Sequence, residues 1–233
     1  MKKLRLLFLI FFLASSVYAK EYNFTGVGLL DVASKKTCTA TLVSPDTVLT
    51  AAHCVFDVKS SRYYPPKYIQ FKPYTKNNDA DYIGVKTYTV GMKGVPKGNF
   101  TQDDLMGDWA LITLKQKVDC SLNRLSLLAQ DKYNNHTLVV AGYPKGSHNQ
   151  LVSDGSCEFA LKPTKGKMLR LKNCSLKHGE SGAPLMVLID GKLKVIGTIS
   201  AGVNDSKGRY RVFAVPSDSF TKKVAKLSQT CEQ

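Results

Sequence analysis

The chain has 233 residues, and its 33 Lys and Arg residues against 18 Asp and Glu residues give a formal net charge of +15. Hydrophobic residues make up 43% and charged residues 22% of the chain, proportions that exclude a disordered or fibrous protein. This length is enough for one large domain or two small ones, so a globular protein is expected.

The N-terminal segment, residues 1–19, has the features of a secretory signal peptide. Lys2, Lys3 and Arg5 precede an apolar run over residues 6–13, and small residues follow up to Ala19. The run is too short to span a bilayer, and no later stretch reaches the roughly 18 apolar residues that a membrane helix needs. We therefore expect a secreted or periplasmic protein without a membrane span.

Most of the remaining chain has the pattern of short β-strands separated by turn residues. Several segments are rich in Val, Ile, Thr and Tyr and recur about every ten residues, which is typical of an all-β barrel or sandwich. These segments include residues 37–43, 47–50, 82–90, 109–114, 137–141, 185–189 and 195–200. Asp190 and Gly191 both tolerate positive φ, which predicts a hairpin between the strands on either side of them.

The end of the chain instead has the periodicity of a helix. Apolar residues recur there on one helical face, at Phe220, Val224, Leu227 and Cys231. Ser217 and Asp218 precede this stripe as candidate caps, so a C-terminal amphipathic helix is predicted over approximately residues 217–230.

Six cysteines lie after the signal peptide, at Cys38, Cys54, Cys120, Cys157, Cys174 and Cys231. An even number in an exported chain predicts three disulfides, for which fifteen pairings exist. No cysteine pair or His/Cys cluster has zinc spacing, so neither a metal nor another cofactor is expected.

Three short segments carry residues suited to chemistry. They are Thr-Ala-Ala-His-Cys around His53, Gly-Asp-Trp-Ala-Leu-Ile around Asp108, and His-Gly-Glu-Ser-Gly-Ala-Pro around Ser181. Each has an ordinary structural interpretation when taken alone, such as a surface histidine, a cap or a turn. Together they supply a base, an orienting acid and a nucleophile, which is the set that a serine needs to attack a carbonyl.

These segments resemble those of the chymotrypsin-like (trypsin-fold) serine peptidases. Residues 50–54 match the histidine motif of that family, and residues 108–111 resemble the segment around its acid. Residues 179–184 resemble its Gly-Asp-Ser-Gly-Gly-Pro motif, with Glu180 and Ala183 as departures. The sequence looks closest to the exported bacterial members, which include the glutamyl endopeptidase group.

The resemblance implies an all-β fold of two six-stranded antiparallel β-barrels followed by a C-terminal α-helix. One peptidase domain would occupy residues 20–233, with sub-barrels over approximately residues 26–120 and 130–215. Cys38 would pair with Cys54 and Cys157 with Cys174, as in the family and its bacterial members, which leaves Cys120 with Cys231.

The resemblance also implies catalytic roles. Ser181 would be the nucleophile, His53 the general base, and Asp108 the group that orients the imidazole. Asp103 and Asp104 compete with Asp108, but Asp108 directly precedes the apolar strand as the family pattern requires. Backbone N–H groups of Gly179 and Ser181 would form the oxyanion hole. No motif surrounds the remaining histidines, which we interpret as exposed loop residues: His136, His148 and His178.

The family position at the base of the primary specificity pocket is Ser175 in this chain. Residues 200–202 resemble the strand that lines the pocket and binds the substrate backbone, which makes Ser200 and Gly202 candidate substrate-binding residues. Serine has no fixed charge, and Ile199 stands where the glutamyl endopeptidases usually have a histidine. A neutral pocket is therefore predicted.

The sequence thus predicts a secreted serine endopeptidase that acts on protein or peptide substrates through an acyl-enzyme intermediate. The alternative is a catalytically silent homologue that binds acidic partners through its basic surface. The basic excess predicts weak, salt-sensitive binding to anionic surfaces. No nucleic-acid motif is present, so specific nucleic-acid binding is not expected, and a monomer is predicted.

Overall fold

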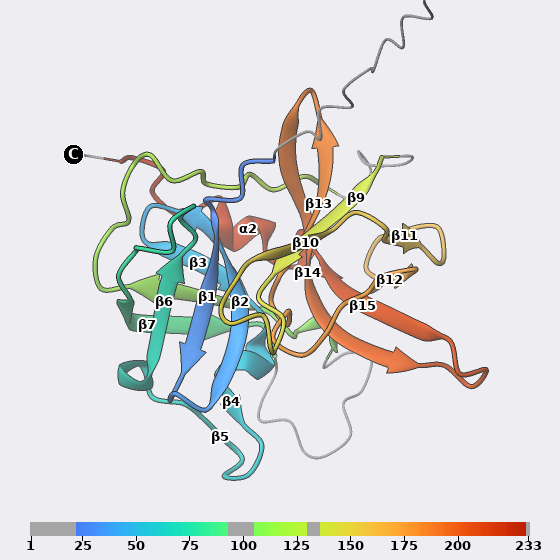
Figure 1. Ribbon diagram of the computed structural model, residues 1–233, viewed down its shortest axis with the longest axis horizontal. Coiled ribbons are helices and arrows are strands. Elements are labelled where there is room, and N and C mark those ends of the chain that lie inside the picture. Colours follow the sequence, from blue (N-terminus) through green and yellow to red (C-terminus); the bar gives the residue numbers. More distant parts are fainter. Residues whose placement is uncertain (1–21, 93–104, 130–135, 232–233) are drawn as a thin grey trace, which may run out of the picture.

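The computed structural model describes residues 22–92, 105–129 and 136–231. The predicted signal peptide and the competing acids Asp103 and Asp104 lie outside these residues. Figure 1 shows two β-rich halves side by side, the first built from the blue-to-green strands and the second from the yellow-to-red strands. Within the described residues, no helix is long and apolar enough to cross a membrane.

The first half is a closed antiparallel barrel with the strand order β1-β2-β3-β8-β7-β6. Its strands are β1 (Val27–Val32), β2 (Lys36–Ser44), β3 (Thr47–Thr50), β6 (Ile69–Pro73), β7 (Ile83–Val90) and β8 (Ala110–Leu114). A two-stranded hairpin of β4 (Phe56–Asp57) and β5 (Arg62–Tyr63) extends from it. The barrel interior is filled by apolar side chains of alternating strand positions, among them Leu30, Leu42, Val48, Phe71 and Ile112.

The second half is a curled sheet of seven strands in the order β10-β9-β13-β14-β15-β12-β11. Its strands are β9 (Leu138–Gly142), β10 (Val152–Asp154), β11 (Glu158–Phe159), β12 (Leu169–Lys172), β13 (Pro184–Ile189), β14 (Lys192–Asn204) and β15 (Tyr210–Pro216). The predicted double-barrel architecture is confirmed, but the second barrel is not the closed six-stranded one that was expected. Its end strands β10 and β11, of 3 and 2 residues, do not pair with each other.

The predicted hairpin joins β13 to β14. Ile189 pairs with Lys192, and the two turn residues between them, Asp190 and Gly191, have φ values of 49° and 77°. Positive φ at both central positions matches the right-handed twist of the flanking strands, so the hairpin prediction is confirmed.

The C-terminal helix is much shorter than predicted. A 3₁₀ turn over Ser217–Ser219 is followed by the single α-helical turn α2 (Thr221–Val224), rather than by one helix to residue 230. After α2 the chain tightens, because the N–H of Lys226 and that of Leu227 bond carbonyls three residues back. The predicted apolar face is nevertheless the face that packs, since Phe220 and Val224 are buried.

Two apolar clusters join the halves. In one, Leu49 and Trp109 of the first half contact Val215 and Phe220 of the second. Three disulfides link Cys38 with Cys54, Cys157 with Cys174, and Cys120 with Cys231, which are the pairs that the resemblance implied. The last of them ties the segment after β8 to the end of the chain.

Candidate active site

His53 lies on a 3₁₀ turn, Ala52–Val55, that follows directly from strand β3. The neighbouring Cys54 is fully buried and bonded to Cys38 on β2, which anchors the turn to the barrel. The Nζ atom of Lys36 donates a hydrogen bond of 2.5 Å to the carbonyl oxygen of His53. The disulfide and this hydrogen bond therefore hold the backbone of His53 and Cys54 in place. The His53 side chain itself is 22% exposed.

Asp108 lies just before β8 and is buried, with 2% of its side chain exposed. Its Oδ1 accepts the backbone N–H of His53, and its Oδ2 lies 2.8 Å from His53 Nδ1. Oδ2 also accepts a hydrogen bond of 2.5 Å from the hydroxyl of Ser200. The carboxylate thus receives donors from both halves of the molecule.

These contacts determine the charge state of Asp108. Burial by itself would raise the pKa of this carboxyl group, but the charge of His53 and the hydrogen bonds from His53 and Ser200 lower it below its ordinary value. An ionised Asp108 can only accept, so the proton of the shared bond lies on His53 Nδ1. In the neutral imidazole, the Nε2 atom of His53 is then left as an acceptor.

Ser200 owes its position to a break in the strand ladder. The pairing of β14 with β15 shifts register between Ile199 and Ala201, so Ser200 lies at a β-bulge. Bulges redirect side chains and are frequent beside active sites. Ser200 was predicted as a substrate-binding residue, and its bond to Asp108 was not foreseen.

Ser181 lies on the loop between β12 and β13, between two glycines with positive φ. Gly179 has φ of 97° and Gly182 has φ of 82°. A Cβ atom on Gly182 would lie 2.1 Å from the Thr50 hydroxyl and 2.3 Å from the Thr39 carbonyl oxygen, so the loop fits directly against the first barrel.

Thr39, which is fully buried on β2, attaches this loop to the first barrel. Its backbone N–H donates to the carbonyl of Ser181 at 2.9 Å, and its hydroxyl donates to the carbonyl of Gly179 at 3.0 Å. Sequence reasoning missed this residue, because a threonine inside a strand carries no signal of a partner 140 positions away.

The backbone N–H groups of Gly179 and Ser181 donate no hydrogen bond to any described residue, whereas that of Gly182 donates to the Ile199 carbonyl. The Cys54 sulfur lies 3.7 Å from the Ser181 carbonyl oxygen and 4.0 Å from His53 Nε2, which brings the serine loop close to the histidine turn. Within the described chain, the Ser181 hydroxyl makes no hydrogen bond to the imidazole. Catalytic hydrogen bonds of this kind are often long without substrate.

A cavity of about 510 Å³ opens beside Ser181. It is lined by both polar and apolar residues, among them Leu176, Ser200, Ala201, Gly202, Tyr210 and Val212. The Tyr210 hydroxyl approaches Gly202 closely and donates to the Leu176 carbonyl at 3.0 Å. Ser175 is exposed, donates its backbone N–H to Asp154, and is not part of this lining.

Glu180 is buried next to the nucleophile candidate. Burial raises the pKa of its carboxyl group, and a hydrogen bond from the Lys177 N–H to its Oε2 partly offsets this. Cys38, His53 and Cys54 form the one cluster of metal-ligand residue types within the described residues. Both sulfurs are in the disulfide, so they offer no thiolate to a metal.

The three histidines that were interpreted as exposed loop residues differ in their distance from the candidate site. His178 lines the cavity beside Ser181, while His136 and His148 are exposed away from it. The structure therefore brings together His53, Asp108, Ser181, Gly179, Ser200 and Gly202, and it leaves Ser175 outside the cavity.

The model of the Trypsin family matches residues 17–224. The chain belongs to the trypsin family. Members of this family are serine endopeptidases, so the protein is a hydrolase that acts on peptide bonds. No curated protein gives a sequence match to the chain.

The trypsin-family fold is also seen in a solved structure titled "Structure of Glu endopeptidase in complex with MPD". The two share 17% sequence identity with a TM-score of 0.63, over 87% of this chain and 92% of the other. At this identity the likeness establishes the fold, not the specificity. The family and fold predictions from the three motifs are thereby confirmed.

Proposed function

We propose that the protein is a secreted serine endopeptidase in which Ser181, His53 and Asp108 form the catalytic triad. The supporting observation is the buried carboxylate of Asp108, which holds His53 through both its backbone N–H and its Nδ1. This arrangement fixes the tautomer that leaves Nε2 free to accept a proton. The Ser181 carbonyl oxygen and His53 Nε2 lie 3.7 Å and 4.0 Å from the same Cys54 sulfur, which supports a short path between the serine loop and the imidazole.

In the first step, the Ser181 hydroxyl attacks the scissile carbonyl carbon while His53 Nε2 takes the hydroxyl proton. The C–N bond then breaks, and the imidazolium returns that proton to the departing amine, which leaves an acyl-enzyme. Water attacks the acyl carbon in the second step, with His53 again acting as the base, and Ser181 is released. Asp108 remains ionised throughout and stabilises the imidazolium.

The unpaired backbone N–H groups of Gly179 and Ser181 support a role in binding the oxyanion of both tetrahedral intermediates. Donors that are not used within the protein stay available for the charge that develops on the substrate oxygen. The positive φ of Gly179 fits this role, because a Cβ atom there would lie 2.3 Å from the Tyr143 carbonyl oxygen.

We further propose that the cavity beside Ser181 receives a neutral, apolar or aromatic side chain. Ile199, Ala201 and Val212 form apolar parts of its lining, and no acidic residue of the described chain lines it. A preference for Lys or Arg is therefore not expected. Lys145, Lys177 and His178 also line the cavity, which makes Glu the competing preference to test.

Secretion is supported by the three disulfides, because such bonds persist in oxidising compartments. It rests in addition on the signal-peptide pattern of residues 1–19.

The test is cleavage of a mixed peptide library by residues 20–233, with the cut sites identified by mass spectrometry. We expect cuts after neutral side chains and a loss of about a million-fold in kcat for Ser181→Ala. Ser206→Ala, which alters an exposed serine, is the matched control and should retain full activity.

Cuts that persist in Ser181→Ala would contradict the serine mechanism. Cuts after Glu alone would keep the mechanism and overturn the neutral pocket. An absence of cuts from the folded wild-type protein would favour the silent homologue that binds acidic partners.

A further inference from the structure

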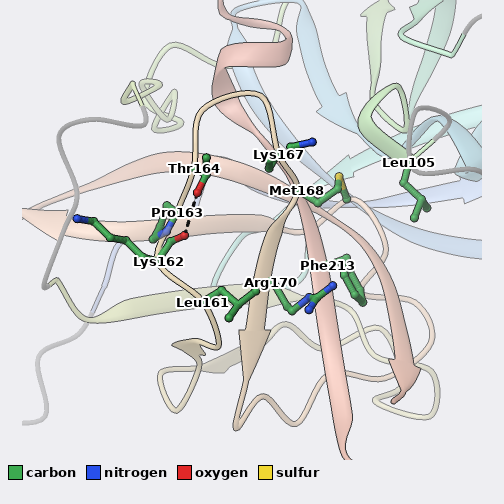
Figure 2. A pocket seen from close by; sticks show the side chains of 9 residues that line it. All are labelled: Leu105, Leu161, Lys162, Pro163, Thr164, Lys167, Met168, Arg170 and Phe213. Carbon is green, nitrogen blue, oxygen red and sulfur yellow. Dashed lines mark hydrogen bonds between the residues drawn. The ribbon is translucent and has the colours of Figure 1, made fainter. Parts of the chain in front are cut away.

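A second cavity, of about 410 Å³, lies on the outer side of strands β12 and β15. Figure 2 shows its lining, in which Arg170 extends beside Phe213 and Met168 lies toward Leu105. Leu161 lines the same cavity with 59% of its surface exposed. Part of the lining is therefore apolar and open to solvent, and the cavity shares no lining residue with the one beside Ser181.

The rim of this cavity is strongly basic. Residues 159–172 contain five basic residues and no acidic one: Lys162, Lys165, Lys167, Arg170 and Lys172. Of these, Lys172 forms an ion pair with Glu158 at 3.1 Å. Lys162, Lys167 and Arg170 line the cavity and form no ion pair with any described residue.

Two acids of this half have partners of their own. Asp205 binds Arg209 and Arg211, and Asp154 accepts hydrogen bonds from Ser156 and the backbone of Ser175. Within the described residues, no acid forms an ion pair with Lys162, Lys167 or Arg170, so their charge is available to a ligand. A carboxylate held there would be stabilised by two or more cations at once.

The cavity adjoins the candidate active site. Phe213 pairs with Arg170 on one side and with Ala201 on the other, and Ala201 lines the cavity beside Ser181. On the opposite wall, the carbonyl of Leu105 accepts the N–H of Asp108. A polypeptide bound at Ser181 therefore needs to cross only one strand to reach the basic rim.

We propose that this cavity, which we call the basic pocket, binds an acidic segment of the polypeptide substrate that also carries an apolar side chain. The apolar side chain packs against Leu161, Met168 and Phe213, and flanking carboxylates bind Lys167 and Arg170. This inference rests on the proposed function, since it assigns that peptidase a preference for acidic sequence outside the cleaved bond.

A nucleic acid fits the basic pocket less well. The Arg170 guanidinium lies over the Phe213 ring at 5.3 Å from the centroid, so that aromatic face is already covered. Proteins that bind single strands without sequence preference use open aromatic faces on which bases stack. Tighter binding of a polyanion, such as heparin or an oligonucleotide, is therefore the competing result that the experiment can detect.

The test measures binding separately from cleavage. Two fluorescein-labelled peptides share one cleavable sequence, and one carries a Glu-Leu-Glu triplet where the other carries Gln-Leu-Gln. In a series of such pairs, the triplet is placed one residue further from the cleaved bond each time. Anisotropy with the Ser181→Ala protein gives Kd, and the wild-type protein gives kcat/KM. At the best triplet position we expect the Glu peptide to bind about fivefold more tightly, as for two partly exposed ion pairs, and less so in high salt.

The variant Lys167→Gln/Arg170→Gln should abolish this fivefold preference in both Kd and kcat/KM. Its matched control, Lys86→Gln/Lys192→Gln, removes the same charge from exposed positions outside the pocket and should retain the preference. Both variants alter exposed side chains, so thermal unfolding midpoints should stay near that of the parent.

Equal binding of the two peptides, or an equal loss in the control variant, would overturn the proposal. A heparin or oligonucleotide that binds more tightly than the Glu peptide and is lost in the same pocket variant would also overturn it. If Ser181→Ala shows the preference but the wild-type protein cleaves neither peptide, the proposed function fails while the basic pocket stands.

Discussion

The closed barrel holds His53 and Asp108 through buried hydrogen bonds, whereas the curled sheet presents Ser181 on a loop shaped by two glycines. In the first half, Asp108 is almost completely enclosed and its oxygens meet fixed donors. In the second half, the serine loop depends on backbone conformation and on its contact with Thr39 and Thr50. The barrel thus supplies the rigid part of the site, which is His53 and Asp108. The sheet supplies the serine loop, whose position depends on its packing against the barrel.

Among the variants that keep the Ser181 hydroxyl, the largest effect is expected from the rigid half. Asp108→Asn should lower kcat by about 10,000-fold, because the amide no longer holds the tautomer of His53 that leaves Nε2 as a base. Steady-state kinetics on a peptide found in the library checks this. Asp79→Asn, which changes an exposed carboxylate of the same half, should leave kcat unchanged. A loss below tenfold in Asp108→Asn would exclude Asp108 as the triad acid.

The disulfides compare the halves directly, since Cys38–Cys54 and Cys157–Cys174 close loops with sequence separations of 16 and 17. Replacing either pair by Ala should lower the free energy of unfolding by about 3 kcal/mol, measured by urea titration at neutral pH. The Cys38–Cys54 variant alone should also lose kcat/KM, because the Cys54 sulfur contacts both the His53 imidazole and the Ser181 carbonyl oxygen. Equal losses of activity in both variants would show that the bridge does not position the site.

Alanine substitutions at two glycines with similar positive φ test whether the serine loop packs against the first barrel. Gly191→Ala, where φ is 77° and no atom lies within 4 Å of the new Cβ, should cost about 1 kcal/mol of stability and no activity. Gly182→Ala meets Thr50 and Thr39 as well, which adds about 1–3 kcal/mol and displaces Ser181. Chemical denaturation and kcat/KM give both quantities. Identical behaviour of the two variants would mean that the loop is not seated against the barrel.

The smallest effect concerns the hydrogen bond that joins the halves at Asp108. Removing its donor with Ser200→Ala should cost about 1.5 kcal/mol of stability and about tenfold in kcat/KM at neutral pH. Because the pKa of Asp108 is lowered in the folded protein, its contribution is present above the unfolded value of 3.8 and is lost as the pH falls through the folded value. The stability difference between wild type and Ser200→Ala should therefore shrink below about pH 4.

Unfolding free energies of both proteins across this pH range check the last expectation. Ser44→Ala removes a similar hydrogen bond, to Asp46, at the β2–β3 turn and so at the opposite end of β3 from His53, and should leave kcat/KM unchanged. A pH-independent difference for Ser200→Ala would show that its hydroxyl does not act through the charge of Asp108.

Much of the strand pattern could be predicted from sequence, because β-branched and aromatic residues are concentrated between turn residues. The prediction of residues 47–50 agrees with β3, and that of residues 82–90 differs from β7 by one residue. The helix prediction over residues 217–230 failed beyond Val224, because apolar spacing predicts a buried face and not the length over which backbone bonds persist. Strand β12 was not among the predicted strands, although Leu169 and Leu171 alternate there with Arg170 and Lys172.

The sequence by itself determined the family and the double-barrel class, and it predicted the triad of His53, Asp108 and Ser181, because those signals are short and local. Only the tertiary structure decided which other groups form hydrogen bonds to these residues and to the serine loop. The Ser200 hydroxyl reaches Asp108 across 92 positions, and Thr39 reaches Gly179 across 140. The basic pocket likewise exists only where Leu105, Arg170 and Phe213 meet. The conformational preferences of neighbouring residues place them on strands. Packing between strands that are distant in sequence decides which side chains meet, and no short stretch of sequence encodes that packing.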